Sequence, residues 1–469
     1  MFDAIIYTER REKLKIKLGS GVVLLLGNEE SGMNYRDNWY PFRQDSTFLY
    51  YFGLNQASLA AVIDIDENRE VIYGDELTVE DIVWTGTQPT IREKANSCNV
   101  NHTAPLNDLI PFLKNAQSKN RKIHFLPPYR PENKLKLMDW LEIHPTEVKE
   151  KASIPLVKAV VAQRSIKSPE EIQELDKAVS ITAKMHRRAM EIARPGMKEK
   201  EIAALLMQIA RSEGLGLSFP PITTINGQTL HNTYYENTLT NDHMLLVDAG
   251  AETTMNYAGD MTRTFPVRGY FKQQEKEIYE IVLNSINAAA DMLQPGILHQ
   301  DVYFRACEVI VEGLKDLGIM QGDPQEAVQA GAHALFFPCG LGHMMGLDIH
   351  DMEDLGEEYV GYDDKIKKGT QFGLKSLRLG KKLEPGFVLT TEPGIYFIPE
   401  LTELWKAEGK FTDFINYEKL KSYSHLNGFR IEDNYVITEK GKRLLGDPVP
   451  KTVEEVEKCR KSSSQEVPA

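Results

Sequence analysis

The chain has 469 residues, of which 42% are hydrophobic and 26% are charged, and these proportions are ordinary for a globular protein of two or three domains. Its net charge of −13 disfavours nucleic-acid binding and binding to an anionic membrane. The N-terminus does not resemble a signal peptide, no apolar run is long enough to span a membrane and the four cysteines are scattered, so we expect a cytoplasmic protein without disulfides.

Residues 1–160 have the pattern of an α/β domain. Apolar runs of strand length occur at residues 22–26, 57–65, 70–73 and 122–126, and each predicts a strand. The segment 36–46 is rich in arginine, aromatic and amide side chains. It is either a loop packed on its own aromatics or a segment that faces a ligand. Nothing in this domain has catalytic spacing, so we expect it to shape a site or to mediate oligomerisation.

A second domain, residues 161–458, begins with a clear helix start. Ser168 is suited to an N-cap, Pro169 to the first helical position and Glu171 to the third position of a capping box. Apolar side chains then recur at helical spacing as far as the Pro-Gly pair at 195–196. Another helix is expected to begin near Glu199.

The same pattern returns about one hundred residues later, with a Pro-Gly pair at 295–296 and a further helix expected near Asp301. In both copies, strand-like segments with conspicuous polar residues follow the helices. The repeat predicts a catalytic domain built from two similar α/β halves that face each other. Residues 459–469 form a polar tail that we expect to fray.

Two aspartates in the first half stand at the ends of strand-like segments. The apolar run 245–247 leads directly to Asp248, and a short polar excursion then leads to Asp260. Two strands joined by a turn would bring both carboxylates to one end of a sheet. Carboxylates held so close repel each other unless they share a proton or a cation. Our hypothesis is that they share metal ions.

Further candidates occur in three later segments. A glycine-rich segment carries His343 and His350; its glycine spacing is not that of a phosphate-binding loop, but glycines let the backbone pass close to a bound ion or substrate. Glu392 ends an apolar strand just before a Pro-Gly turn. Strand alternation puts Arg430 and Glu432 on the same face of a third segment.

Together these segments supply four carboxylates and one imidazole at strand ends. A set that is rich in oxygen and has a single nitrogen suits a two-metal site for manganese, cobalt, iron or zinc. A glycosidase needs only two carboxylates and no histidine, so that alternative explains fewer of the residues.

The order of these motifs resembles that of the proline-specific metallopeptidases, aminopeptidase P and prolidase, which have the pita-bread fold. The motifs are DAG at 248–250, AGDMTRTFP at 258–266, GLGH at 340–343, TEPG at 391–394 and RIED at 430–433. PFRQDS at 41–46 resembles the N-terminal domain of the same family, so the resemblance covers the whole chain. It implies an N-terminal α/β domain followed by a duplicated pita-bread catalytic domain.

The resemblance implies a dinuclear metal site, with manganese as the first choice and cobalt, zinc or iron as alternatives. A hydroxide that bridges the two metals would attack the carbonyl before proline, because the metals lower the pKa of the bound water. Asp260 and Glu432 would bridge the metals. The implied ligands are Asp248, Asp260, His343, Glu392 and Glu432.

Other roles implied by the resemblance concern protons and substrate. Glu392 would also take the proton of the nucleophile and pass it to the leaving proline nitrogen. His231 and His350 correspond to histidines that hold the substrate and the tetrahedral intermediate. Arg430 would orient the bridging carboxylates from behind the ligands.

Two positions depart from the family pattern. The interval from Asp248 to Asp260 is one residue longer than usual, which predicts either a bulge or a longer turn between the strands. Cys339 stands where the family usually has a histidine. A neutral thiol cannot replace an imidazolium as a charged donor, so Cys339 either alters contacts on the proline side or is inert packing.

The resemblance leaves two activities open, an Xaa-Pro dipeptidase (prolidase) and an aminopeptidase P that acts on longer peptides. A dipeptidase must also recognise the free carboxylate of proline, for which an arginine is suited. The segment GLKSLR at 373–378 resembles the prolidase segment that supplies this arginine, and the match falls on Arg378. We therefore favour the dipeptidase.

Two other classes on the same fold are a metal-free binding module and a creatinase-type hydrolase. Both lack the complete ligand set, so they explain the sequence less well. The expected partners are small Xaa-Pro peptides and, by family resemblance, a second copy of the chain in a homodimer.

Overall fold

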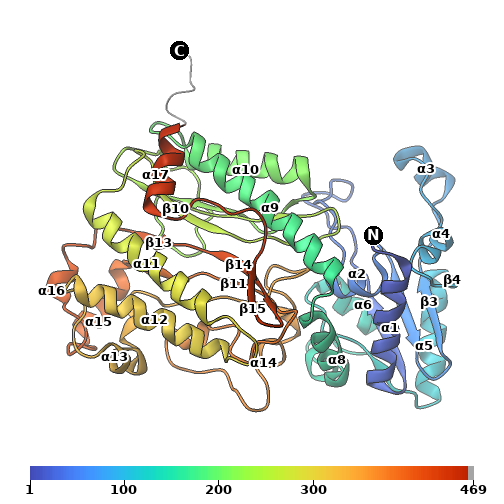
Figure 1. The fold of residues 1–469 in the computed structure, drawn as a ribbon. Helices are drawn as coiled ribbons and strands as arrows, with labels where there is room; N and C mark the ends of the chain where they lie inside the picture. Colours follow the sequence, from blue (N-terminus) through green and yellow to red (C-terminus); the bar gives the residue numbers. More distant parts are fainter. Residues whose placement is uncertain (463–469) are drawn as a thin grey trace. The chain divides into compact units, whose positions relative to one another are not determined.

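The computed structural model describes residues 1–462, which form two compact units (Figure 1). The first unit contains residues 1–164 and 352–359, and the second contains residues 165–351 and the described chain from residue 360 onward. Among the described residues, no helix is both long enough and apolar enough to cross a membrane. All four cysteines are free.

The first unit is organised around a five-stranded mixed sheet with the strand order β4-β3-β2-β1-β5. The strands are β1 (Val22–Leu26), β2 (Ala60–Asp64), β3 (Arg69–Tyr73), β4 (His102–Ala104) and β5 (Ile123–His124). The central pairs are antiparallel, and both edge strands pair parallel to their neighbours. The four predicted strands are confirmed. The short polar strand β4 has no alternating apolar pattern, and for that reason it was not predicted.

Helices cover this sheet and contribute side chains such as Leu113 and Leu137 to its core. The helices of the unit are α1 (Ala4–Leu18), α2 (Ser46–Phe52), α3 (Val79–Thr85), α4 (Ile91–Asn96), η1 (Leu106–Asp108), α5 (Leu109–Ser118), α6 (Pro131–Leu141), α7 (Val148–Lys151) and α8 (Ile154–Ser165). Of these, α3 has no buried residue and adds nothing to the core. The segment η3 (Glu353–Leu355) belongs to the same unit.

The arginine- and aromatic-rich segment 36–46 ends at the start of α2. Its aromatic side chains are not packed together, since Trp39 is 48% and Tyr40 54% exposed. Hydrogen bonds within the segment fix its shape, including one from Trp39 Nε1 to the Arg36 carbonyl at 2.6 Å. The half-exposed rings do not favour the first alternative, a loop packed on its own aromatics.

The second unit contains the two predicted helix pairs. The pairs are α9 (Pro169–Ile192) with α10 (Glu199–Glu213) and α11 (Gln273–Met292) with α12 (His299–Asp316). The remaining helices are α13 (Pro324–Ala330), η2 (Ala332–Leu335), η4 (Leu374–Ser376), α15 (Pro399–Ala407), α16 (Tyr417–Leu420) and α17 (Val453–Ser462). All of α14 (Glu357–Val360) except its last residue belongs to the first unit. The Ser168 hydroxyl caps α9 and Glu171 closes the capping box, so this helix start is confirmed.

Each helix pair is followed by a three-stranded antiparallel sheet, in the order β10-β8-β7 and β11-β14-β15. The strands of the unit are β6 (Gly216–Leu217), β7 (Ile222–Thr224), β8 (Met244–Asp248), β9 (Ala251–Glu252), β10 (Thr262–Pro266), β11 (Val388–Thr391), β12 (Gly394–Tyr396), β13 (Gly428–Arg430), β14 (Asp433–Thr438) and β15 (Gly441–Leu444). The strands lie between the two helix pairs (Figure 1). This repetition agrees with a duplicated catalytic domain.

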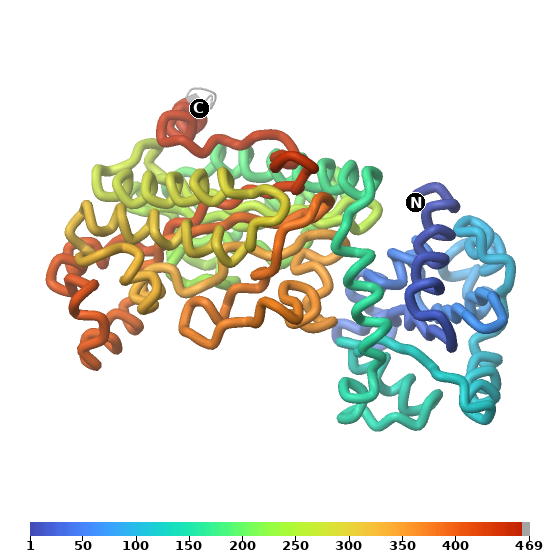
Figure 2. Tube along the Cα trace, turned by 60° about the horizontal axis from the view of Figure 1, so that its bottom comes forward, coloured from blue at the N-terminus to red at the C-terminus, as the bar shows by residue number. Residues whose placement is uncertain are grey.

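The C-terminal segment crosses the second unit and ends in α17, as the red tube in Figure 2 shows. Residues 459–462 of the expected polar tail are helical, and Arg460 is buried. The rest of that tail, residues 463–469, lies outside the described part of the chain.

Candidate metal centre

Asp248 and Asp260 lie on a hairpin that keeps one strand register as far as its turn. Asp248 pairs with Thr262, and the same register continues through the Ala249 to Met261 and Gly259 to Ala251 hydrogen bonds. The chain reverses at residues 253–257, where Asn256 has a left-handed backbone with φ 64°. The hairpin therefore has the longer turn rather than a bulge between the two aspartates.

The glycine in the DAG motif is required by this hairpin. A Cβ atom on Gly250 would lie 1.7 Å from the Gly259 carbonyl oxygen, so no side chain fits opposite the residue that precedes Asp260. The close approach of the two backbones brings both carboxylates to the same end of the hairpin.

Glu392 and Glu432 lie at matching breaks in two paired segments. Thr391 pairs with Asp433 in one sheet, and Gly394 pairs with Arg430 in the next. The common register sets Glu392 directly opposite Glu432, where the chains leave one sheet and enter the other. Arg430 ends β13 and Asp433 begins β14, so Glu432 lies in the break between two strands and not on one uninterrupted strand with Arg430.

His343 lies on an extended segment beside β11. Its backbone N–H donates to Thr390 Oγ1 at 3.1 Å, and its carbonyl accepts from the Thr390 N–H at 3.0 Å. A Cβ on Gly342 would lie 2.1 Å from the Thr390 carbonyl oxygen. This glycine therefore lets one backbone approach another, and not a bound ion as the sequence suggested.

The imidazole of His343 faces the carboxylates of both halves. Its Nδ1 lies 3.0 Å from the Met344 carbonyl; because a carbonyl can only accept, a neutral ring carries its proton on Nδ1 and presents the lone pair of Nε2. Nε2 lies 3.5 Å from Asp260 Oδ2 and 3.7 Å from Glu392 Oε1. Ligand atoms of Asp260, His343 and Glu432 all lie within 4.8 Å of one another.

The carboxylates of this group are buried and incompletely satisfied. Asp248 Oδ1, Asp260 Oδ1 and Glu432 Oε1 have no hydrogen-bond partner within residues 1–462. Burial raises the pKa values of Asp260 and Glu432 well above the usual range, and neighbouring carboxylates raise them further. Buried negative charges without partners are costly, so this oxygen-rich group with one imidazole nitrogen fits divalent cations.

Arg430 connects the two halves of the site through an ion pair and hydrogen bonds. Its guanidinium forms an ion pair with Asp248 and donates from Nη1 to the Tyr396 hydroxyl at 2.9 Å. Its Nε donates to Thr262 Oγ1 at 3.0 Å, and that hydroxyl donates to Glu432 Oε2 at 2.8 Å. Arg430 thus contacts Asp248 directly and reaches Glu432 only through Thr262.

The predicted substrate-binding residues lie around the same group. The rings of His350 and His343 are 4.2 Å apart. Burial lowers the pKa of His231, and the charges of Arg430 and then Arg378 lower it further, while Asp248 opposes them. His231 therefore lies within electrostatic range of both arginines and of one aspartate of the hairpin.

A buried ion pair fixes the segment that carries both histidines. Lys167 Nζ lies 2.7 Å from Asp351 Oδ2, and each side chain is 1% exposed. The Asp351 N–H also donates to the Met344 carbonyl at 2.9 Å. A fully desolvated pair of this kind is sensitive to the loss of either partner, so it holds the segment in one conformation.

Cys339 carries no charge near neutral pH. Burial raises the pKa of its thiol to about 12, and the neighbouring Glu392 carboxylate contributes to the increase. The residue is therefore a neutral thiol, which agrees with inert packing and not with an imidazolium substitute.

Several residues of this site were missed by the sequence analysis. Thr262 binds Glu432, Tyr396 binds Arg430, and the Asn434 side chain accepts from the Asp260 N–H at 3.4 Å. Thr262 and Asn434 stand two residues after Asp260 and Glu432. Alternation along a strand puts such residues on the same side, so this signal was present in the sequence.

Comparison with known proteins agrees with the geometry. Residues 173–439 match metallopeptidase family M24, and residues 7–124 match the aminopeptidase P N-terminal domain. The chain is 30% identical to Xaa-Pro dipeptidase from Homo sapiens, over 96% of this chain and 91% of that protein. It is also 30% identical to a "Probable Xaa-Pro aminopeptidase" from Sordaria macrospora, over 96% of this chain and 93% of that protein.

The structure of zinc-substituted E. coli aminopeptidase P in complex with product is similar as well. The TM-score is 0.79 at 28% sequence identity, and the alignment covers 98% of this chain and 99% of that one. The resemblance drawn from the order of the motifs is thereby confirmed. The chain belongs to metallopeptidase family M24 and carries an N-terminal domain of the aminopeptidase P type.

Proposed function

We propose that this protein hydrolyses the peptide bond before proline, as an exopeptidase with two divalent metal ions. The observation that carries the proposal is a group of buried carboxylates, some of whose oxygens accept no hydrogen bond, beside Nε2 of His343. The proposed ligands are Asp248, Asp260, His343, Glu392 and Glu432. Because the chain belongs to a metallopeptidase family, metal binding explains these five residues better than a purely structural polar group does.

Manganese is the first choice of metal, with cobalt, zinc or iron as alternatives, because carboxylates and imidazole suit all four. Two such ions would polarise the peptide carbonyl and lower the pKa of an attacking water. Asp260 and Glu432 are proposed as the bridging ligands, since they come from different halves of the duplicated domain and share the 4.8 Å group with His343.

We assign proton transfer to Glu392. Its side chain is 22% exposed, more than that of Asp248, Asp260 or His343, so it can exchange a proton with substrate or solvent. Burial raises its pKa, and the Asp260 charge adds to this effect. A carboxyl group with a raised pKa is suited to accept a proton and to donate it to the leaving nitrogen.

The other proposed roles concern substrate. His231 and His350 are assigned to contacts with the peptide and with the negative charge that develops at its carbonyl. Arg430 is assigned to orientation of Asp248 and, through the Thr262 hydroxyl, of Glu432. The contacts given above support the assignments of Arg430 and His350. For His231 the support is the effect of the Arg430 and Asp248 charges on its pKa.

A dipeptidase is favoured over an aminopeptidase because of Arg378. This arginine is half-buried and its charge acts on His231, so a positive charge is available on the substrate side of the proposed centre. The alternative, an aminopeptidase P, is retained because a relative described as an aminopeptidase is as similar as one described as a dipeptidase.

The proposal is tested with purified protein, its metal content and three peptides. We expect tightly bound transition metal, loss of activity after chelation and recovery on adding Mn²⁺. Gly-Pro should be a better substrate than Gly-Pro-Pro, whereas Gly-Ala should not be cleaved. Absence of metal, or activity unaffected by chelation, would contradict the metallopeptidase assignment. Equal or faster turnover of Gly-Pro-Pro would select the aminopeptidase.

We further propose that the protein forms a homodimer. Its support is an apolar surface on and beside α3, where Val79 is 79%, Val83 75% and Trp84 82% exposed. Surfaces of this kind are typical of protein contacts.

Sedimentation equilibrium should give twice the chain mass, and Trp84→Glu should shift the protein toward the monomer. Trp39→Glu, which changes another exposed tryptophan of the same unit, is the control; a monomeric wild type would contradict the proposal.

A further inference from the structure

The side chain of Arg263 is buried behind the proposed metal ligands. It belongs to β10, three residues after Asp260, and only 1% of the residue is exposed. Strand alternation turns Arg263 away from the face that carries Asp260 and Thr262. Its guanidinium is therefore not a candidate for contact with metal or substrate, yet a buried guanidinium must be fully bonded to be tolerated.

The guanidinium holds the backbone at the break where Glu432 lies. Nη1 donates to the carbonyl oxygens of Thr262 and Glu432. The Glu432 N–H in turn donates to the Thr262 carbonyl at 3.1 Å. Since Glu432 lies between β13 and β14 and outside both strands, these bonds replace the ladder that would otherwise fix its backbone.

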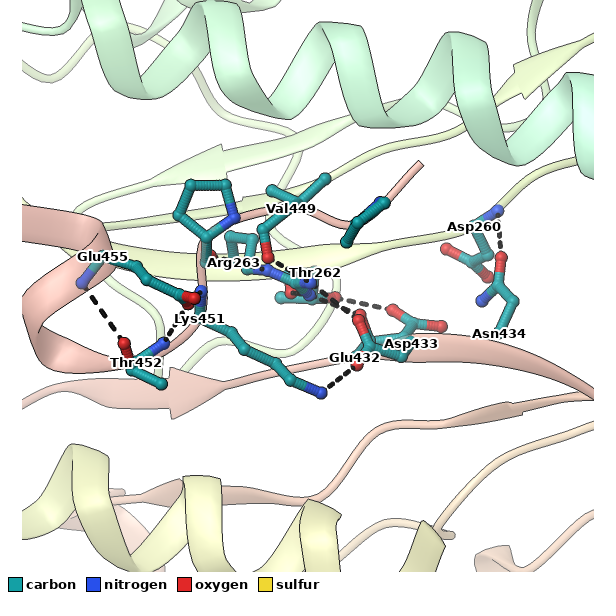
Figure 3. Close-up of polar contacts among 12 residues, drawn as sticks. Asp260, Thr262, Arg263, Glu432, Asp433, Asn434, Val449, Lys451, Thr452 and Glu455 are labelled. Atoms are coloured by element: carbon teal, nitrogen blue, oxygen red, sulfur yellow. Dashed lines mark hydrogen bonds and ion pairs between the residues drawn. The ribbon is translucent and has the colours of Figure 1, made fainter. Parts of the chain in front are cut away.

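Asp433 is the counter-ion of Arg263 (Figure 3). Arg263 Nη2 lies 2.7 Å from Asp433 Oδ1, and Lys451 Nζ lies 2.7 Å from Asp433 Oδ2. Each oxygen of the Asp433 carboxylate therefore contacts one cation. The residue after Glu432 is thus held as a carboxylate by two cations.

The same guanidinium reaches the C-terminal segment. Nε donates to the Pro450 carbonyl at 3.2 Å and Nη2 to the Val449 carbonyl at 3.4 Å. The Lys451 carbonyl accepts from the Tyr279 hydroxyl at 2.9 Å. Residues 449–451 therefore form one wall of the polar pocket that encloses Arg263, and Asp433 and Glu432 form the other.

Arg460 anchors the far end of this segment without contacting the metal group. Its guanidinium donates to the carbonyl oxygens of Met190, Ala193, Pro266 and Val267. Like Arg263, it is buried and bonded to backbone oxygens, with 6% of the residue exposed against 1% for Arg263. Arg263 and Arg460 are thus both buried arginines that attach the C-terminal segment, and Arg263 also bonds to a proposed ligand, Glu432.

We propose that Arg263 is a positioning residue for the dinuclear centre, and that the C-terminal residues 449–451 complete its pocket. The inference rests on the proposed function, because it concerns how Glu432 is presented to the metals. The planar fork of arginine serves several acceptors at once, whereas lysine offers a single ammonium group. Arg263→Lys should therefore keep the positive charge but lose the hydrogen bond to the Glu432 carbonyl.

The test measures Mn²⁺ binding to metal-free, full-length protein by calorimetry. We expect Arg263→Gln and Arg263→Lys to weaken binding by about 10- to 100-fold, the usual effect of losing a partner behind the ligands. Lys451→Met should weaken it in the same direction, because Asp433 loses one of its two cations. This third variant changes a side chain that is 27% exposed, so it remains informative if the Arg263 variants do not fold.

Arg460→Gln is the matched control for general stability. It removes a buried arginine from the same segment, so it should lower the unfolding temperature but leave the Mn²⁺ affinity of the folded protein unchanged. The proposal is overturned if the Arg263 and Lys451 variants bind Mn²⁺ as wild type does, or if Arg460→Gln weakens binding as much as they do. Failure of the wild type itself to bind Mn²⁺ would instead contradict the proposed function.

Discussion

Glu432→Gln should reduce kcat/KM for Gly-Pro by on the order of 10³-fold, because several kcal/mol of transition-state stabilisation depend on correctly held metals. The substitution is isosteric and retains an oxygen that can accept from Thr262 Oγ1. It removes only the negative charge that we assign to bridging. Metal content should fall together with activity, as measured by elemental analysis and by turnover of the dipeptide.

The unfolding temperature of the same variant, measured without metal, should not fall. In the metal-free protein, burial and the Asp260 charge raise the pKa of Glu432, so at neutral pH its charged form destabilises the fold. A neutral glutamine relieves this repulsion, and the metal-free variant should unfold at the same temperature as wild type or above it. Added Mn²⁺ should stabilise wild type, which binds it in the folded state, but not the variant.

Glu384→Gln is the control for this pair of measurements. Glu384 also stands immediately before a Pro-Gly pair, as Glu392 does, but it is exposed. Its substitution should leave activity, metal content and metal-dependent stabilisation unchanged. A Glu432→Gln protein with normal activity and the normal response to Mn²⁺ would show that Glu432 is not a ligand.

The sequence predicted those elements whose signals are local. The start of α9 follows from the Ser168 and Glu171 capping box, and the end of each first helix follows from a Pro-Gly pair. Four of the five strands of the N-terminal sheet follow from apolar runs, and the polar β4 does not. The proposed ligands were identified by the order of short motifs, since each motif couples a strand end to a carboxylate or an imidazole.

Features that depend on contacts between distant segments could not be derived in this way. The ion pair of Arg430 with Asp248 and that of Lys167 with Asp351 join residues more than a hundred and eighty positions apart. The position of Glu432 at a break between strands also escapes the pattern, because alternation continues through it. Sequence spacing gives the side of a strand but not its partner.

The longer turn between Asp248 and Asp260 illustrates the same limit. Spacing showed that one residue had been added but left both a bulge and a turn possible. The structure keeps one strand register up to the turn and has a left-handed Asn256 at the tip, which is a conformation that asparagine tolerates. The longer turn therefore lies away from the carboxylates. Both aspartates lie at the same end of the hairpin.

Arg378→Ala should separate the two candidate activities. If Arg378 binds the carboxylate of proline, kcat/KM for Gly-Pro should fall by about 10- to 150-fold, which corresponds to the roughly 1.5–3 kcal/mol of a hydrogen bond to a charged group. Gly-Pro amide lacks that carboxylate, so the variant should cleave it as wild type does. Lys375→Ala, an exposed basic residue of the same segment, is the control and should behave as wild type on both substrates.

The two changes, in the enzyme and in the substrate, form a double-mutant cycle. If arginine and carboxylate contact each other, the loss from both changes together should be smaller than the sum of the separate losses, and the difference is the coupling free energy. Additive losses would mean that Arg378 acts on activity without contacting the carboxylate. The dipeptidase assignment would then lose its structural support.

An independent readout comes from His231. Burial lowers the pKa of this histidine, and the positive charges of Arg430 and Arg378 lower it further. Removing the charge of Arg378 stabilises the imidazolium, so the pKa of His231 should rise in Arg378→Ala, as measured by NMR titration. Bound dipeptide should raise it in the wild type for the same reason, because the carboxylate neutralises Arg378. A pKa that responds to neither change would remove Arg378 from the neighbourhood of the substrate.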